Sequence, residues 1–288
     1  MIYVSTSGIK KESVLDIIDE LIESGINNIE LSGGTKPIDN LDDKILSYKN
    51  KNINFLLHNY FPPPKENFVI NIASCDKEVF NNSINQCLNA IKLSKKLNAK
   101  KYAVHAGFLI DPKPKEIGLG TNVNFKKNFF DKDQSINQMK LALERFTKEA
   151  NGELKIYLEN NVLSKKNSEI FENNPFFLTD KKSFLDLRKK IKFNLLLDLA
   201  HLKVSCKSQN LNFIEEANFL INQTDYVHLS GNNGYEDTGN GIIEDKEILE
   251  ILKINNLKNK VFTLEIYEGT NKINKNLNFL KNLITNHH

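Results

Sequence analysis

Short apolar runs in this chain repeatedly end at a histidine or a carboxylate. The polar residues at or just after these ends are His58, His105, Glu159, Asp198, His201, His228 and Glu265. A short apolar run is typical of a buried strand, and the ends of parallel barrel strands meet at one rim. The pattern therefore predicts a ring of metal-type ligands at one face of a barrel.

The apolar runs recur about every 36 residues, which is the length of one β/α unit. The predicted strands are Ile2–Ser5, Asn28–Ser32, Asn54–His58, Lys101–His105, Lys155–Glu159, Asn194–Asp198, Tyr226–Leu229 and Val261–Ile266. Amphipathic segments with one apolar face lie between them. The predicted helices are Glu12–Glu23, a weaker one at Leu41–Tyr48, Val79–Leu97, Ser135–Ala150, Lys182–Lys190, Phe213–Asn222, Lys246–Leu252 and Ile273–Ile284.

Alternating strands and helices indicate parallel pairing through right-handed crossovers. We expect one α/β domain over residues 1–288, a (β/α)8 TIM barrel. The alternative is an open doubly wound sheet, which would carry a glycine-rich phosphate turn after its first strand. Neither Ser7-Gly8 nor Ser32-Gly33-Gly34 supplies that motif. Long connections at residues 59–75 and 107–132 follow strands that end in histidine, and we expect both to wall the pocket.

The composition limits the partners. The net charge is +3, from 39 basic and 36 acidic residues, and the only arginines are Arg145 and Arg188. Because arginine is the usual bidentate ligand of phosphate and guanine, the composition disfavours nucleic acid. The cysteines form no pairing motif, and no apolar segment is long enough for a membrane span. We expect a cytoplasmic protein, and the sequence leaves open whether it forms a homo-oligomer.

Glu159, Asp198, His228 and Glu265 follow the fifth to eighth predicted strands. Imidazole and carboxylate ligands together suit a divalent ion such as zinc, manganese or cobalt. Taken singly, each acid is better explained as a helix cap or surface charge, and each histidine as a hydrogen-bonded core residue. Taken together they favour metal, because structural accidents would scatter histidines over helices as well. His201 leaves the same strand end as Asp198 and is placed to contact substrate or a second ion.

This order of residues resembles the xylose isomerase-like TIM-barrel superfamily, which contains sugar isomerases, epimerases and endonuclease IV (AP endonuclease family 2). The resemblance covers nearly the whole chain. In the ketose 3-epimerase branch it implies that Glu159, Asp198, His228 and Glu265 hold one ion. The two glutamates also act as acid and base there, and the residue matching His201 binds substrate.

A second likeness points to the endonuclease branch. The segments His58-Asn-Tyr, Ile70-Asn-Ile-Ala-Ser74 and His105-Ala-Gly are similar to those that carry further zinc ligands in endonuclease IV. There the residues matching Glu159, His58 and His105 share one ion.

The residue matching His201 belongs to a third ion in that branch, which also needs an Asp-x-His motif. This chain reads Asp237-Thr-Gly239 at that place. Because hydrolysis of a phosphodiester depends on several ions, the missing histidine favours the sugar branch. A phosphodiesterase that lacks the full third site is the alternative, and a non-catalytic metabolite-binding barrel is a third hypothesis.

The expected activity is a sugar or sugar phosphate isomerase or epimerase of carbohydrate metabolism, acting through an enediolate. Glu159 or Glu265 would remove a proton and the other would return it. His58 and His105 would hold a second ion or contact the sugar. Weaker candidates are Glu30, which faces the pocket or pairs with a lysine, Asn160, and a flexible loop at residues 232–241. Phe61, Phe108 and Tyr267 receive no role.

Overall fold

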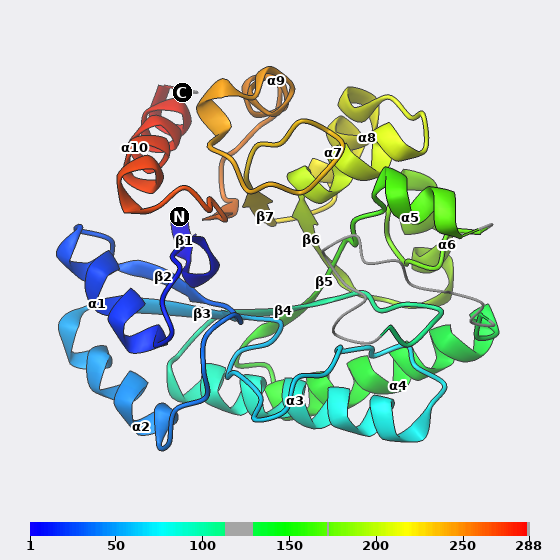
Figure 1. Ribbon diagram of the computed structural model, residues 1–288, viewed down its shortest axis with the longest axis horizontal. Coiled ribbons are helices and arrows are strands. Elements are labelled where there is room, and N and C mark those ends of the chain that lie inside the picture. Colours follow the sequence, from blue (N-terminus) through cyan, green and yellow to red (C-terminus); the bar gives the residue numbers. More distant parts are fainter. Residues whose placement is uncertain (113–128, 172, 287–288) are drawn as a thin grey trace.

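The computed structural model describes residues 1–112, 129–171 and 173–286, and its parallel strands close into one barrel (Figure 1). The order around the barrel is β1 to β8, with β8 paired to β1. The strands are β1 (Ile2–Ser5), β2 (Asn28–Leu31), β3 (Asn54–His58), β4 (Lys101–His105), β5 (Lys155–Glu159), β6 (Asn194–Asp198), β7 (Tyr226–Leu229) and β8 (Val261–Leu264). The predicted (β/α)8 barrel is confirmed. Strands β2 and β8 end one and two residues earlier than predicted, so Glu265 lies just past its strand.

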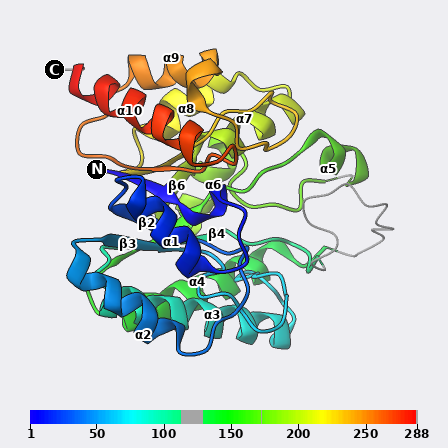
Figure 2. The same ribbon diagram turned by 60° about the vertical axis from the view of Figure 1, so that its left-hand side comes forward.

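Helices surround the barrel in the order of the chain (Figure 1). In the turned view, α9 and α10 lie above the strands and α2, α3 and α4 below them (Figure 2). The helices are α1 (Val14–Glu23), α2 (Leu41–Leu46), α3 (Lys77–Lys96), α4 (Lys132–Ala150), α5 (Lys165–Ile170), α6 (Lys181–Lys190), α7 (Leu199–Ser208), α8 (Phe213–Ile221), α9 (Lys246–Ile254) and α10 (Thr270–Asn286). No helix in the described ranges is long and apolar enough to cross a membrane.

Two helices are absent from the predicted set, α5 and α7. Helix α5 has only six residues and buries none of them, so it has no apolar face to detect. Helix α7 begins directly after β6 and is buried from Leu199 to Cys206. A helix that is buried on every side lacks the polar face from which the 3.6-residue period is recognised.

Alternation along the strands places the polar strand ends inside the barrel. Successive strand residues point to opposite faces. Val4, Ile29 and Leu57 face outward and join the main apolar core beneath the helices. The alternate positions form a separate small core inside the barrel, made of Tyr3, Leu56, Ala99, Ala103, Tyr157, Leu196 and Tyr226. The ligand-type residues on strands β3 to β7 also point into the barrel, because each lies two positions further along its strand than a residue of this small core, nearer the carboxyl end.

Strand register brings these inward residues to one level. His105 pairs with Glu159 across β4 and β5, and Asp198 pairs with His228 across β6 and β7. Residues far apart in the chain therefore become neighbours at the carboxyl rim.

The connection at residues 59–75 packs against the segment that follows β4. The Asn71 amide donates hydrogen bonds to the Phe108 and Ile110 carbonyl oxygens, at 3.1 and 3.0 Å. Of the second long connection, residues 113–128 lie outside the described residues. That these two connections wall the pocket stays a prediction.

Candidate metal centre

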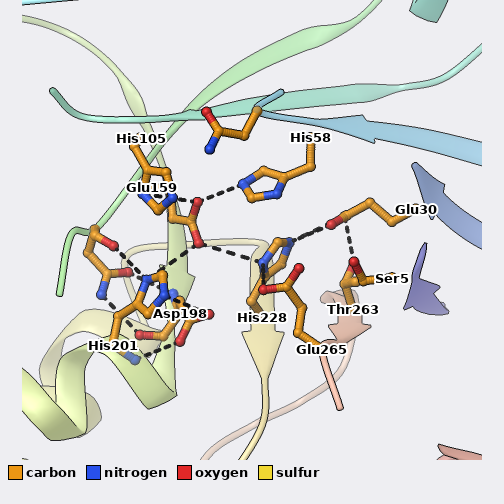
Figure 3. Close-up of polar contacts among 12 residues, drawn as sticks. Ser5, Glu30, His58, His105, Glu159, Asp198, His201, His228, Thr263 and Glu265 are labelled. Atoms are coloured by element: carbon orange, nitrogen blue, oxygen red, sulfur yellow. Dashed lines mark hydrogen bonds and ion pairs between the residues drawn. The ribbon is translucent and has the colours of Figure 1, made fainter. Parts of the chain in front are cut away.

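Glu159 lies at the centre of the rim, with histidines on both sides of its carboxylate (Figure 3). Its Oε2 atom is 2.6 Å from His58 Nε2 and 3.4 Å from His105 Nδ1. Its Oε1 atom is 3.6 Å from both His201 Nδ1 and His228 Nδ1. The structure thus divides the predicted residues into an Oε2 side, with His58 and His105, and an Oε1 side with the others.

On the Oε1 side, two of the converging ligand atoms lack hydrogen-bond partners among the described residues. His228 Nδ1 is also 3.4 Å from Glu265 Oε2. Among the described residues, Glu159 Oε1 and His228 Nδ1 are buried and neither has a hydrogen-bond partner. Glu159, Asp198 and His228 each offer one ligand atom within 4.8 Å of the others. Because a buried polar atom is costly unless it is paired, this arrangement fits a bound cation.

The two glutamates carry negative charge despite their burial. Burial by itself raises the pKa of Glu159, but His105, His58 and the hydrogen bond from His58 hold that pKa well below its ordinary value. Burial also acts to raise the pKa of Glu265, and the opposing effect of His228 lowers it to about 2. Both side chains are therefore ionised carboxylates at neutral pH, able to bind a cation.

Asp198 has a structural contact as well as a place among the ligands. One carboxylate oxygen, Oδ1, accepts a hydrogen bond of 2.8 Å from the His201 backbone amide and caps α7. The other, Oδ2, lies 3.9 Å from His201 Nε2. Burial raises the pKa of Asp198 to about 7. Asp198 can cap α7 with Oδ1 and still offer Oδ2 as a ligand, so the two explanations are compatible.

Asn160 supports this strand end rather than facing a ligand. Its Oδ1 accepts from the Asp198 amide at 2.7 Å, and its Nδ2 donates to the Asp198 carbonyl oxygen at 3.0 Å. The Asn160 carbonyl oxygen is 3.0 Å from His201 Nδ1. Asn160 therefore fixes the backbone of Asp198 and the ring of His201.

On the Oε2 side, His58 already hydrogen-bonds the glutamate, whereas His105 Nδ1 has no hydrogen-bond partner among the described residues. The 2.6 Å contact between His58 and Glu159 is a short buried hydrogen bond. Burial acts to lower the pKa of His58, but Glu159 raises it above its ordinary value. For His105, burial lowers the pKa to about 4. His58, His105 and Glu159 form a second group of candidate ligands, but an ion there would have to replace the existing hydrogen bond.

For Glu30 the sequence left two alternatives, a side chain that faces the pocket or one that pairs with a lysine, and its partners in the described residues are His228, Thr263 and Tyr226. Its carboxylate is fully buried, and the Oε1 atom lies 3.0 Å from His228 Nε2 (Figure 3). Thr263 and Tyr226 donate hydrogen bonds to Oε2. The alternation of residues along β2 could have identified Glu30, because it places the side chain inside the barrel, as it does for the ligand-type residues of the other strands.

In the loop after β7, a neighbouring aromatic ring lies against position 239. Gly239 has a φ of +61°, and a Cβ atom there would lie 2.3 Å from Cδ2 of Tyr267. The Tyr267 amide also donates a hydrogen bond of 2.7 Å to the Gly239 carbonyl oxygen. Asp237, two residues earlier, approaches His201 Nε2 at 3.2 Å. The aromatic ring thus fills the space that a side chain at position 239 would need.

Comparison with known proteins agrees with this architecture. A family model described as xylose isomerase-like TIM barrel matches residues 18–283. A search among curated proteins returned no match.

Solved structures with the same fold include sugar epimerases and a nuclease. A D-tagatose 3-epimerase-like protein superposes with a TM-score of 0.71 at 19% identity, covering 99% of this chain and 97% of the other. D-Psicose 3-epimerase from Clostridium cellulolyticum gives 0.63 at 13% identity, covering 98% and 99%. Endonuclease IV from Thermus thermophilus gives 0.61 at 12% identity, covering 99% of each chain. At these identities the likeness shows the fold alone.

Proposed function

Because the chain belongs to the xylose isomerase-like TIM-barrel family, we propose that it is a divalent-metal-dependent sugar isomerase or epimerase. The reaction would move a proton on a carbon next to a carbonyl group, through an enediolate. The observation that carries this proposal is the pair of buried, unpartnered atoms Glu159 Oε1 and His228 Nδ1, 3.6 Å apart. Structural neighbours that act on ketoses, such as D-psicose 3-epimerase, support the same substrate class.

We assign the ion to Glu159, Asp198, His228 and Glu265. Three carboxylates and one imidazole suit zinc, manganese or cobalt. When bound, a divalent ion would polarise a substrate carbonyl and lower the cost of negative charge on its oxygen. Such an ion would accept the lone pairs of Glu159 Oε1 and His228 Nδ1, which have no hydrogen-bond partner among the described residues.

The proton transfers belong to Glu159 and Glu265. Both pKa values lie below their ordinary range, so both side chains are ionised at neutral pH, which is the form that a general base requires. Glu265 accepts a hydrogen bond of 3.3 Å from the Ser7 hydroxyl, which orients the carboxylate at the rim. One glutamate would remove the proton and the other would return it. His201, fixed by Asn160, would orient a substrate oxygen.

The second candidate function is phosphodiester hydrolysis. The His58, His105 and Glu159 group and the endonuclease IV fold favour it. Two observations weigh against it. Tyr267 occupies the space at Gly239. Both arginines, the residues best suited to bind phosphate, lie over phenylalanine rings. Arg145 lies over the ring of Phe80, and Arg188 over those of Phe184 and Phe193.

Two assays on one preparation separate these functions. If the proposal holds, NMR will show deuterium exchange from D2O into a ketose or sugar phosphate in the presence of Mn²⁺, Co²⁺ or Zn²⁺. Cleavage of an abasic-site duplex without such exchange would support the phosphodiesterase instead. Metal analysis is the control: a protein that purifies without any divalent ion, and gains nothing from added ions, would contradict both enzyme functions.

A further inference from the structure

Glu30 is a carboxylate on the inner face of the barrel, below the rim. It lies on β2, while its partners lie on β7 and β8, across the barrel (Figure 3). Its Oε1 atom is 3.0 Å from His228 Nε2. Its Oε2 atom accepts 2.8 Å from the Thr263 hydroxyl and a further hydrogen bond from the Tyr226 hydroxyl. All four side chains are fully buried.

These contacts fix the His228 ring from one edge. Nε2 faces Glu30, and Nδ1 faces Glu159 and Glu265 on the opposite edge (Figure 3). A neutral imidazole carries one N–H group and one free lone pair. If Nε2–H is donated to Glu30, the lone pair lies on Nδ1, toward the carboxylates of the rim.

We propose that Glu30 is the positioning residue of the metal centre, holding His228 in the orientation and tautomer that present Nδ1 to the ion. This inference rests on the proposed function, because it assigns a role relative to the proposed ion. The role requires Glu30 to act through His228, without touching the substrate. Histidine ligands of metal ions commonly donate their second N–H to such a carboxylate, which raises their basicity.

The surroundings of Glu30 hold its carboxylate against His228. Thr263 and Tyr226 both donate to Oε2, and His228 Nε2 also hydrogen-bonds this oxygen at 3.2 Å while lying 3.0 Å from Oε1. The carboxylate therefore cannot turn away from His228 without losing two hydrogen bonds.

Glu30 is fully buried, and no lysine or arginine accompanies it among the contacts of the described residues. Its partners there are two hydroxyl groups and one imidazole. A buried polar group is costly unless it is hydrogen-bonded. The three donors hydrogen-bond the Glu30 side chain, and an ion bound at the other nitrogen of His228 would add positive charge nearby.

The test is zinc affinity, measured on the full chain by competition with a chromophoric chelator. Glu30→Gln keeps the shape of the side chain but weakens its hold on Nε2–H, and we expect roughly tenfold or greater loss of affinity at unchanged stoichiometry. Thr263→Val leaves Glu30 in place and removes one of its donors, with an expected loss on the order of threefold. Thermal unfolding of the metal-free proteins checks that each variant folds.

Asp225→Asn is the matched control. Asp225 precedes the same strand as His228 at its other end, where it pairs with Lys101 at 2.9 Å and accepts from Tyr157 at 2.8 Å. Its loss should lower stability but leave zinc affinity unchanged. Unchanged affinity in folded Glu30→Gln would overturn the positioning role, whereas a wild-type protein that binds no zinc would overturn the proposed function itself.

A spectroscopic readout does not depend on the stability of any variant. In the zinc-loaded wild type, ¹⁵N NMR of the His228 ring should show a protonated Nε2 and a coordinated Nδ1. The reverse pattern would place the ion on the Glu30 side of the ring and overturn the proposal. If Glu30→Gln does not fold, this spectrum and Thr263→Val decide the question.

Discussion

The two sides of the Glu159 carboxylate contain the same kinds of residue but differ in what they already bind. On the Oε2 side, His58 makes a 2.6 Å hydrogen bond to the carboxylate. On the Oε1 side, both Oε1 and the facing His228 Nδ1 lack a hydrogen-bond partner among the described residues. Proximity of histidines and carboxylates therefore does not define an ion site by itself. What distinguishes the Oε1 side is that the glutamate oxygen itself is unpaired, so an ion beside Asp198, His228 and Glu265 would displace no hydrogen bond of that oxygen.

The largest effect is expected from Glu265→Gln. Gln cannot accept the proton, so the rate of deuterium exchange into the substrate should fall by about 10² to 10⁴. The measurement is kcat/KM for exchange by NMR, with metal content determined in parallel. Wild-type exchange in this variant would remove Glu265 from the proposed chemistry.

The second prediction compares the two sides directly. His228→Gln should abolish tight binding of the first zinc ion, while His58→Gln should leave it within about threefold, because an uncoordinated partner contributes mainly through one hydrogen bond. Isothermal titration on both variants gives affinity and stoichiometry. If His58→Gln removes the first ion and His228→Gln does not, the assignment of the two sides is reversed.

Removal of metal provides the third prediction. An ion that binds only the folded state stabilises it by about 2.7 kcal/mol at 100 times its Kd. For a protein of this size that corresponds to several degrees in Tm. Thermal unfolding with chelator and then with added Zn²⁺ measures it, and His228→Gln is the control that should not respond. An equal response in that variant would show that the ion binds elsewhere.

The smallest effect concerns the loop that distinguishes this chain from the nuclease pattern. Gly239→His places a side chain at a positive φ and against the Tyr267 ring. We expect a loss of about 1 to 3 kcal/mol in unfolding free energy, from backbone strain and overpacking. Denaturant unfolding measures the loss.

Tyr267→Ala in the same chain tests the cause. The double variant should recover the part of the loss that comes from overpacking, since the aromatic ring is gone. A single Gly239→His variant that is as stable as the wild type, and that gains abasic-site cleavage, would show that Tyr267 does not close that position.

Much of the fold was predictable because its signals are local. Buried parallel strands are nearly continuous apolar runs, and the seven ligand-type residues predicted from the sequence lie within three residues of a strand end. Helix α7 was not predicted, because it is buried on all sides and lacks an amphipathic period. The end of β8 was placed too late, since Glu265 and Ile266 continue the apolar pattern after strand pairing has ended.

The sequence by itself determined the barrel and the residues that gather at its rim, because strand period and chain order fix both. Only the tertiary structure decided which atoms face which. Glu30 meets His228 across 198 residues of chain, and Tyr267 fills the space beside Gly239. These contacts depend on closure of the barrel and on the directions of side chains inside it, which no local pattern encodes. The division of Glu159 into a paired and an unpaired oxygen has the same origin.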